Sequence, residues 1–174
     1  MTMAEVEAVG PDLIGNREWQ RLLGAAAHTR YPCRDRSLLH LFWHLGATVR
    51  QVSALEVDSV DLRTGALVWP DGRESRIPAE ALQVLNAYVS LERDRRCPRL
   101  FSGRHGRPLT PADIDRCFRC LSRFSGLRVD PLTLRRSALL RLLLAAPLRA
   151  LALRPDRGAA PERLAAARAA QPLA

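Results

Sequence analysis

The chain has 174 residues and a formal net charge of +9, with 27 basic residues, all of them arginine, against 18 acidic ones. Its hydrophobic fraction of 47% is enough for a packed core in one domain and argues against wholesale disorder. Since the sequence contains no lysine, any mechanism that needs a lysine ammonium of this chain is excluded.

The positive charge is concentrated toward the C-terminal end. Up to Arg116 there are 16 arginines and 15 acidic residues, whereas from Cys117 onward there are 11 arginines and three acidic residues. A basic end on a globular chain favours a polyanionic partner, most often nucleic acid. Arginine drift in a high-GC genome is the alternative that charge alone leaves open.

The sequence also predicts where the chain works. The first eleven residues are mildly acidic and lack the apolar stretch of a secretory signal, and four cysteines are not a disulfide framework at this size. The longest apolar run, residues 137–153, is interrupted by Arg141, Pro147 and Arg149 and is not expected to span a membrane. We therefore expect a cytoplasmic protein, associated with the bacterial nucleoid if it binds DNA.

The first half of the chain is predicted to begin with a flexible leader, residues 1–14, followed by three helices. Asn16 is the expected cap of the first helix, residues 16–28, in which Trp19 and Leu22 recur at helical spacing. The second helix, residues 34–45, has an apolar stripe broad enough for the core and ends at Gly46. A short third helix covers residues 49–55.

The next region changes its hydrophobic period. Short extended runs at residues 57–62, 66–69 and 75–77 are separated by turn signals, Thr64-Gly65 and Pro70-Asp71-Gly72. This pattern predicts a three-stranded antiparallel meander.

The remaining elements are helical except for a basic loop at residues 95–108. One helix covers residues 79–93, and another runs from the Thr110 cap to Gly126. After a loop stiffened by Pro131, we expect an apolar helix at residues 137–146 and a shorter piece at 148–153. Residues 158–174 are predicted to be an Ala/Arg/Pro-rich tail. The expected class is therefore α+β, mainly α-helical, with a small sheet.

Several strings occur in a distinctive order: RDRSLL (34–39), Gly46 then VSAL (52–55), DSVDL (58–62), GRESRIP (72–78), LF (100–101) with GRPLT (106–110), and DPLTLRR (130–136). Together with the order of elements, they resemble the catalytic domain of the tyrosine recombinase (phage integrase) family over residues 15–157. The resemblance also implies that the family's separate N-terminal core-binding domain is lacking.

The resemblance implies a phosphate site that is only partly retained. The family clamps the phosphate with two arginines; the first position is Thr48 here, with Arg50 as a neighbour, and the second is Arg135. A family histidine position is Leu132, and a later His or Trp position falls near Arg157.

The other parts of the family's chemistry have no match. The family lysine lies in the turn that here reads Trp69-Pro70-Asp71-Gly72, and the only tyrosines, Tyr31 and Tyr88, lie far upstream of the nucleophile's place. We therefore expect no complete catalytic set, and a catalytically inactive pseudo-recombinase.

DNA binding remains the expected function, as a regulatory relative or a remnant of a mobile genetic element. Contacts from arginine to phosphate give affinity without sequence specificity. The residues expected to face double-stranded DNA are Arg73, Arg76, Arg104, His105, Arg107, Arg135 and Arg136. The alternative is an interaction or oligomerisation module that docks its apolar C-terminal segment on a second copy or a recombinase partner.

No cofactor or metal site is expected. Cys117 and Cys120 are a lone C-x-x-C within a helix and are interpreted as small buried hydrophobes. His40 and His44 are spaced i, i+4 and would chelate a metal only with Glu18 or Asp35, so half-buried or surface histidines are the preferred interpretation. For His105, a phosphate contact and a solvated turn are both left open.

Overall fold

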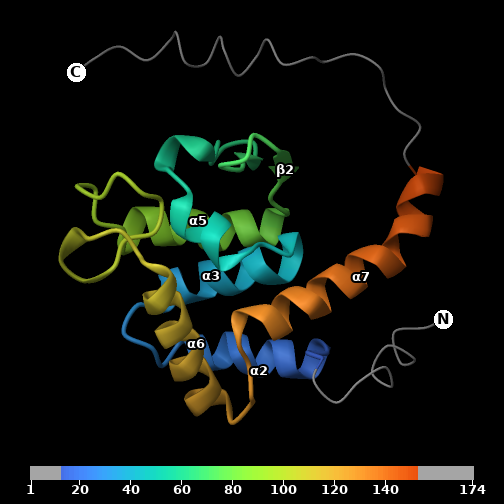
Figure 1. Cartoon of the computed structure of the whole chain (residues 1–174), viewed down its shortest axis with the longest axis horizontal. Helices are drawn as coiled ribbons and strands as arrows, with labels where there is room; N and C mark the ends of the chain where they lie inside the picture. The colour runs from blue at the N-terminus through green and yellow to red at the C-terminus, as the bar shows by residue number, and fades with distance from the viewer. Residues whose placement is uncertain (1–12, 153–174) are drawn as a thin grey trace, which may run out of the picture. The chain divides into compact units, whose positions relative to one another are not determined.

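The computed structural model describes residues 13–152, so residues 1–12 of the expected leader, the expected tail and Arg157 lie outside the described part. The chain divides into two units, residues 1–142 and 143–174. The elements are α2 (Asn16–Ala26), α3 (Pro32–Leu45), α4 (Val49–Ala54), η1 (Val57–Ser59), β1 (Ala66–Val68), β2 (Glu74–Arg76), α5 (Ala79–Leu91), η2 (Arg104–Gly106), α6 (Pro111–Ser125) and α7 (Pro131–Ala152) (Figure 1).

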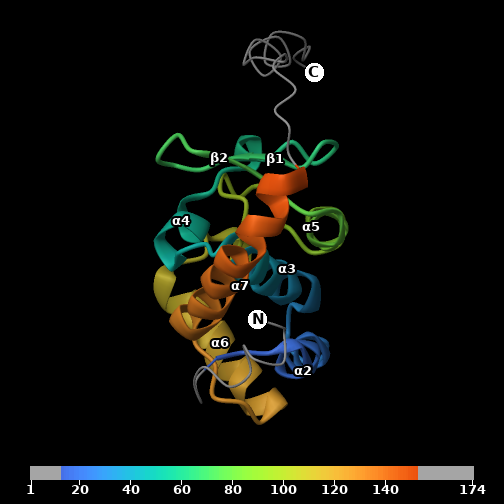
Figure 2. The same cartoon turned by 90° about the vertical axis from the view of Figure 1, so that its right-hand side faces the viewer.

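The first unit is built around α3. Figures 1 and 2 show α2 and α6 at one end, the β1–β2 hairpin at the other, and α3 with α5 between them. The side chains of Leu38, Leu39 and Phe42 on α3 are fully buried. Trp43 stacks on Trp19 with ring centroids 4.8 Å apart, and Phe42 meets Phe118 of α6 edge-on. The broad apolar stripe predicted for α3 is therefore the centre of the core.

Helix starts differ from the prediction by one or two residues. The cap of α2 is Gly15 rather than Asn16, and the Glu18 carboxylate accepts a hydrogen bond from its backbone N–H at 3.1 Å. Helix α3 begins at Pro32, because proline suits a first helical position. The next two backbone N–H groups, of Cys33 and Arg34, both donate to the Glu92 carboxylate at 2.9 Å.

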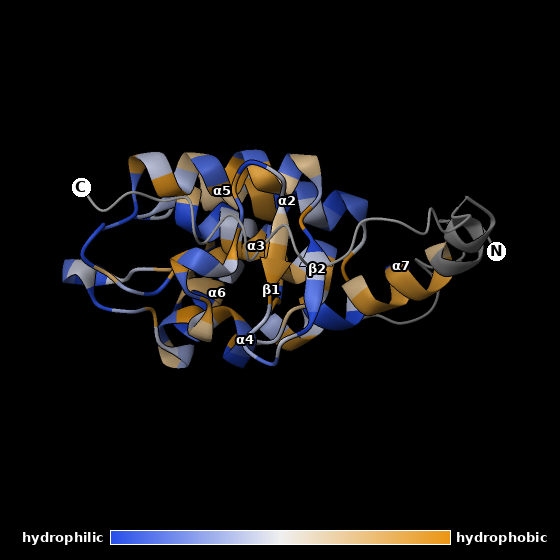
Figure 3. Cartoon of the chain, turned by 90° about the horizontal axis from the view of Figure 1, so that it is seen from above, coloured by the Kyte–Doolittle hydropathy of each residue, from blue (hydrophilic) through white to orange (hydrophobic). Residues whose placement is uncertain are grey.

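The sheet has two strands, not three. β1 and β2 pair antiparallel, with Leu67 opposite Ser75. The first predicted strand is instead the 3₁₀ turn η1 followed by a single bridge between Val60 and Leu67. Asp61 explains the difference, because its carboxylate accepts from the backbone N–H groups of Arg63 and Thr64 and thereby stabilises a turn in place of a ladder. Figure 3 shows the hydropathy contrast between β1 and β2.

The C-terminal prediction of a loop and two helical pieces was wrong. α7 starts at Pro131 and continues to Ala152, through the predicted break at Pro147. Pro131 lies in the first turn, where a missing N–H leaves no hydrogen bond unmade, and the Asp130 carboxylate accepts from Thr133 N at 2.7 Å. The first part of α7 also contacts the segment that precedes α2, because Ile14 N donates to Ser137 Oγ at 2.8 Å.

A buried ion pair within α3 contacts α6 through Cys117. Arg34 Nη2 is 2.8 Å from Asp35 Oδ1, with both side chains less than 10% exposed, and also donates to Cys117 Sγ at 3.2 Å. Burial raises the pKa of the Cys117 thiol to about 12, so this thiol stays protonated. The prediction of a buried cysteine is confirmed for Cys117 but wrong for Cys120, which is exposed.

Along the described part of the chain, no helix combines the length and the apolar character needed to cross a membrane.

Candidate nucleic-acid interface

Arg135 is held in place by a long-range hydrogen bond. Its Nε donates to the backbone oxygen of Gly46 at 3.0 Å, joining the start of α7 to the turn between α3 and α4. Gly46 ends α3 in the left-handed conformation, with φ of 59°. The guanidinium of Arg135 uses only Nε in this bond, so its two Nη groups remain available as donors for an oxyanion.

The position that the resemblance assigns to the first arginine has a structural role here. Thr48 is the N-cap of α4: its Oγ1 accepts from Gln51 N at 3.1 Å, and its backbone N–H donates to Gln51 Oε1 at 2.9 Å. Arg50 follows on α4 and is exposed.

The β1–β2 turn lies beside α4 and has an ion pair where the resemblance implies a lysine. Gln51 Nε2 approaches Asp71 Oδ2 at 3.5 Å, and Asp71 pairs with Arg73 at 2.8 Å. Its hydrogen bond from Arg73 lowers the pKa of Asp71, so this carboxyl remains ionised and offers no proton to a leaving group. Sequence reasoning placed Asp71 in the turn at the lysine position but missed Gln51 and its contact with Asp71, although Thr48 and Gln51 have capping-box spacing.

The η2 loop presents three of the predicted DNA-facing residues. Arg104, His105 and Arg107 are all exposed, and His105 adopts a left-handed backbone conformation with φ of 60°. The loop is closed by a bond from Gly103 N to Arg107 O at 2.7 Å. Among the described residues, no hydrogen bond or ion pair joins this loop to the β1–β2 turn or to Arg135.

Arg76 on β2 and Arg136 on α7 are also exposed. No ion pair between described residues neutralises Arg76, Arg104, Arg107, Arg135 or Arg136, whereas Arg73 has Asp71 as its partner. Since unpaired arginines on a surface are the groups that contact phosphates, these five are the strongest candidates of the predicted set.

The two tyrosines lie in different surroundings. Tyr88 is fully buried on α5; its hydroxyl accepts from Ser102 N at 2.8 Å, and burial raises its pKa. Tyr31 precedes α3, with the guanidinium carbon of Arg34 4.4 Å from the centre of its ring. At the family's histidine position, Leu132 is 49% exposed and has no group that transfers a proton.

Replacing Gly46 with alanine should loosen the turn that holds Arg135. A non-glycine residue in the left-handed region costs about 1–2 kcal/mol, and the new Cβ would lie 2.9 Å from Leu139 Cδ2. We therefore expect the free energy of unfolding in urea to fall by at least that amount.

The matched control is Gly24→Ala. Gly24 lies inside α2 with nothing within 4 Å of the added Cβ, so alanine should raise the free energy of unfolding by about 0.5–1 kcal/mol. Equal effects of the two substitutions would contradict the conformational role of Gly46.

The curated proteins to which this sequence is similar are tyrosine recombinases. No protein-family model matches the chain. The tyrosine recombinase XerC of Azotobacter vinelandii is 33% identical over 108 residues, covering 59% of this chain and 36% of that protein. The tyrosine recombinase XerD of Oceanobacillus iheyensis is 29% identical over 145 residues, covering 76% and 49%.

Solved structures agree on the fold. The XerA recombinase matches with a TM-score of 0.68 and 22% identity over 78% of this chain and 50% of that chain. The XerH recombinase bound to its difH substrate matches with a TM-score of 0.60 and 18% identity, covering 79% and 43%. The chain therefore has the fold of a tyrosine recombinase catalytic domain, as its sequence predicted, and it spans about a third to a half of its curated relatives.

Proposed function

We propose that the chain binds double-stranded DNA in a process of DNA integration or recombination and does not itself cleave the strand. The observation that carries this proposal is the state of the phosphate site: Arg135 is fixed on Gly46 O, while Thr48 at the other arginine position serves only as a helix cap. A site with one oriented arginine can hold a phosphate, since a guanidinium is a planar set of donors.

Strand cleavage by this family's chemistry needs a nucleophile and a proton donor. The Tyr88 hydroxyl is buried and hydrogen-bonded, Leu132 has no titratable group, and Asp71 is an ionised carboxylate. These features support binding without cleavage. A structure of lambda integrase bound to DNA also matches the fold, with a TM-score of 0.53 and 18% identity, which supports DNA as the ligand class.

Salt dependence tests the binding proposal. If the five unpaired arginines each contact one phosphate, the slope of log K against log salt should be about −4.5, and the affinity should fall roughly 500-fold between 50 and 200 mM salt. Fluorescence anisotropy with a labelled duplex of arbitrary sequence measures both. A shallow slope, or no binding at 50 mM salt, would overturn the proposal.

The same preparation tests the absence of cleavage. A duplex nicked near its centre traps covalent tyrosyl intermediates, and denaturing gel electrophoresis should reveal no protein–DNA adduct. An adduct would refute the proposed inactivity and leave the binding proposal intact. A substitution of its attacking residue would then identify the nucleophile.

A second candidate function is self-association or docking on a recombinase. Leu132 and Leu139 of α7 are 49% and 39% exposed and recur at a spacing of seven, which places them on one helix face. Sedimentation velocity during the salt series separates the candidates, because oligomers held by this apolar face would persist at high salt.

A further inference from the structure

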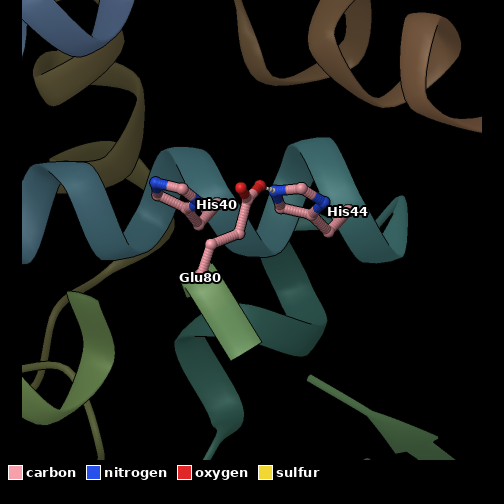
Figure 4. Close-up of side chains that lie close together, drawn as sticks. All are labelled: His40, His44 and Glu80. Carbon is pink, nitrogen blue, oxygen red and sulfur yellow. Dashed lines mark ion pairs between the residues drawn. The ribbon is translucent and has the colours of Figure 1, made fainter. Parts of the chain in front are cut away.

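Two histidines of α3 and one glutamate of α5 lie together in the first unit. His40 and His44 are one helical turn apart, with ring centroids separated by 5.3 Å and planes 14° apart. Glu80, in the first turn of α5, brings Oε1 to 2.6 Å from His44 Nε2. Figure 4 shows its carboxylate between the two rings, and one ligand atom from each residue lies within 4.8 Å of the others.

The two imidazoles have buried nitrogens without hydrogen-bond partners. Within residues 13–152, neither His40 Nδ1 nor His44 Nε2 has one, although both atoms are shielded from solvent. Glu80 Oε1 lies 2.6 Å from His44 Nε2, a contact that counts as an ion pair only if the imidazole is protonated. Among the described residues, neither that nitrogen nor His40 Nδ1 has a partner that meets the geometry of a hydrogen bond. Such atoms are rare in folded proteins because leaving them unsatisfied is costly.

Aromatic and charged side chains surround both rings. Trp19 packs edge-on against both rings, and burial lowers the pKa of His40 to about 4, helped by the charges of His44 and Arg36 against the opposing effect of Glu80. Burial also lowers the pKa of His44, with Arg141 acting in the same direction and Glu80 against it.

We propose that His40, His44 and Glu80 form a binding site for a divalent transition-metal ion, for which zinc fits best. Two imidazole nitrogens and one carboxylate are a recurrent zinc ligand set that leaves a fourth position for water. Glu80 is the exposed member, with a side chain 63% accessible, so an ion can enter from its side. The bound ion would link α3 to α5 and satisfy both orphan nitrogens.

The charges around the site act in both directions, since Arg36 and Arg141 are close enough to lower the pKa values of His40 and His44. The Glu80 carboxylate supplies the negative charge, while the Arg141 guanidinium is directed to Trp43, 4.0 Å from the centre of its ring and bonded to its backbone oxygen. The two third ligands considered from the sequence have other partners, Glu18 at Gly15 N and Asp35 at Arg34.

Zinc titration of the full chain, by competition with a chromophoric chelator, tests the proposal. Wild type should bind one tightly held Zn²⁺, and its thermal unfolding midpoint should rise with zinc. His40→Gln and Glu80→Gln should each weaken binding by at least about 100-fold, because even the loss of a group that only supports a ligand costs 10–100-fold. The matched control, His28→Gln, replaces an exposed histidine and should leave the affinity unchanged.

The four cysteines need a separate readout, since an exposed thiol such as Cys120 also binds zinc. X-ray absorption of the loaded wild-type chain should show nitrogen and oxygen ligands only, whether or not a variant folds. Sulfur ligands, unchanged affinity in Glu80→Gln, or no zinc binding by wild type would each overturn the site.

Discussion

Replacing Arg104, Arg107 and Arg136 together with alanine is expected to weaken duplex DNA binding by roughly two orders of magnitude at about 0.1 M salt. All three side chains are exposed, and none has an ion-pair partner among the described residues. Each phosphate contact releases condensed counterions, so three lost contacts should also reduce the slope of log K against log salt by about three. Anisotropy titrations of wild type and variant at several salt concentrations measure both quantities.

A control with the same change in net charge separates local contacts from general attraction. Arg17, Arg119 and Arg123 are exposed arginines outside the predicted DNA-facing set. Their replacement with alanine removes three positive charges as well, yet should leave the slope near that of wild type. If both triple variants lose the same affinity and slope, the DNA is held by overall charge, and the assigned surface is wrong.

The substitution Asp35→Ala is expected to lower the free energy of unfolding by about 3–5 kcal/mol. Asp35 is the carboxylate partner of Arg34, and their side chains are only 3% and 8% exposed. Without Asp35, the guanidinium would remain buried beside the neutral Cys117 thiol and the Tyr31 ring, neither of which balances its charge. Urea denaturation followed by circular dichroism measures the loss.

The double variant Arg34→Met/Asp35→Ala is the informative companion. Removing both charges eliminates the uncompensated cation, and replacement of buried ion pairs by apolar residues is often close to neutral. We expect the double variant to be clearly more stable than Asp35→Ala alone. A loss below about 1 kcal/mol for Asp35→Ala would mean that water reaches the guanidinium and that the pair is effectively a surface one.

The helical part of the fold was predictable because its signals are local. Apolar spacing over one turn located α2, α3, α5 and α6 to within a few residues, and Gly46 and Gly126 end their helices in the left-handed conformation. The strand prediction was wrong because local side-chain hydrogen bonds favour a turn where the hydrophobic pattern predicts a strand. The Asp61 carboxylate accepts a hydrogen bond from the backbone N–H of Arg63 in the turn that follows it. Val60 therefore makes a single β-bridge and is not part of a strand.

For the candidate sites too, local signals were visible in the sequence and contacts between distant segments were not. The family resemblance assigned Arg135 to one arginine position and Thr48, Leu132 and the Trp69–Gly72 turn to the other family positions, and these assignments stay predictions. It did not reveal that Arg135 bonds to Gly46 O, or that Gln51 meets Asp71, because those contacts join segments far apart in the chain. The histidine pair was visible at its i, i+4 spacing, but Glu80 was not.

Composition, hydrophobic period and turn residues by themselves determined an arginine-rich, mainly helical domain without lysine, since each of these properties depends only on the residues present and their order along the chain. Tertiary structure decided the surroundings of the individual side chains. It determined which arginines have no ion-pair partner among the described residues, that Tyr88 is buried in the core, and that Glu80 lies beside the two histidines. The physical reason is that charge, pKa and ligand geometry depend on distances between side chains, and those distances exist only after the helices have packed.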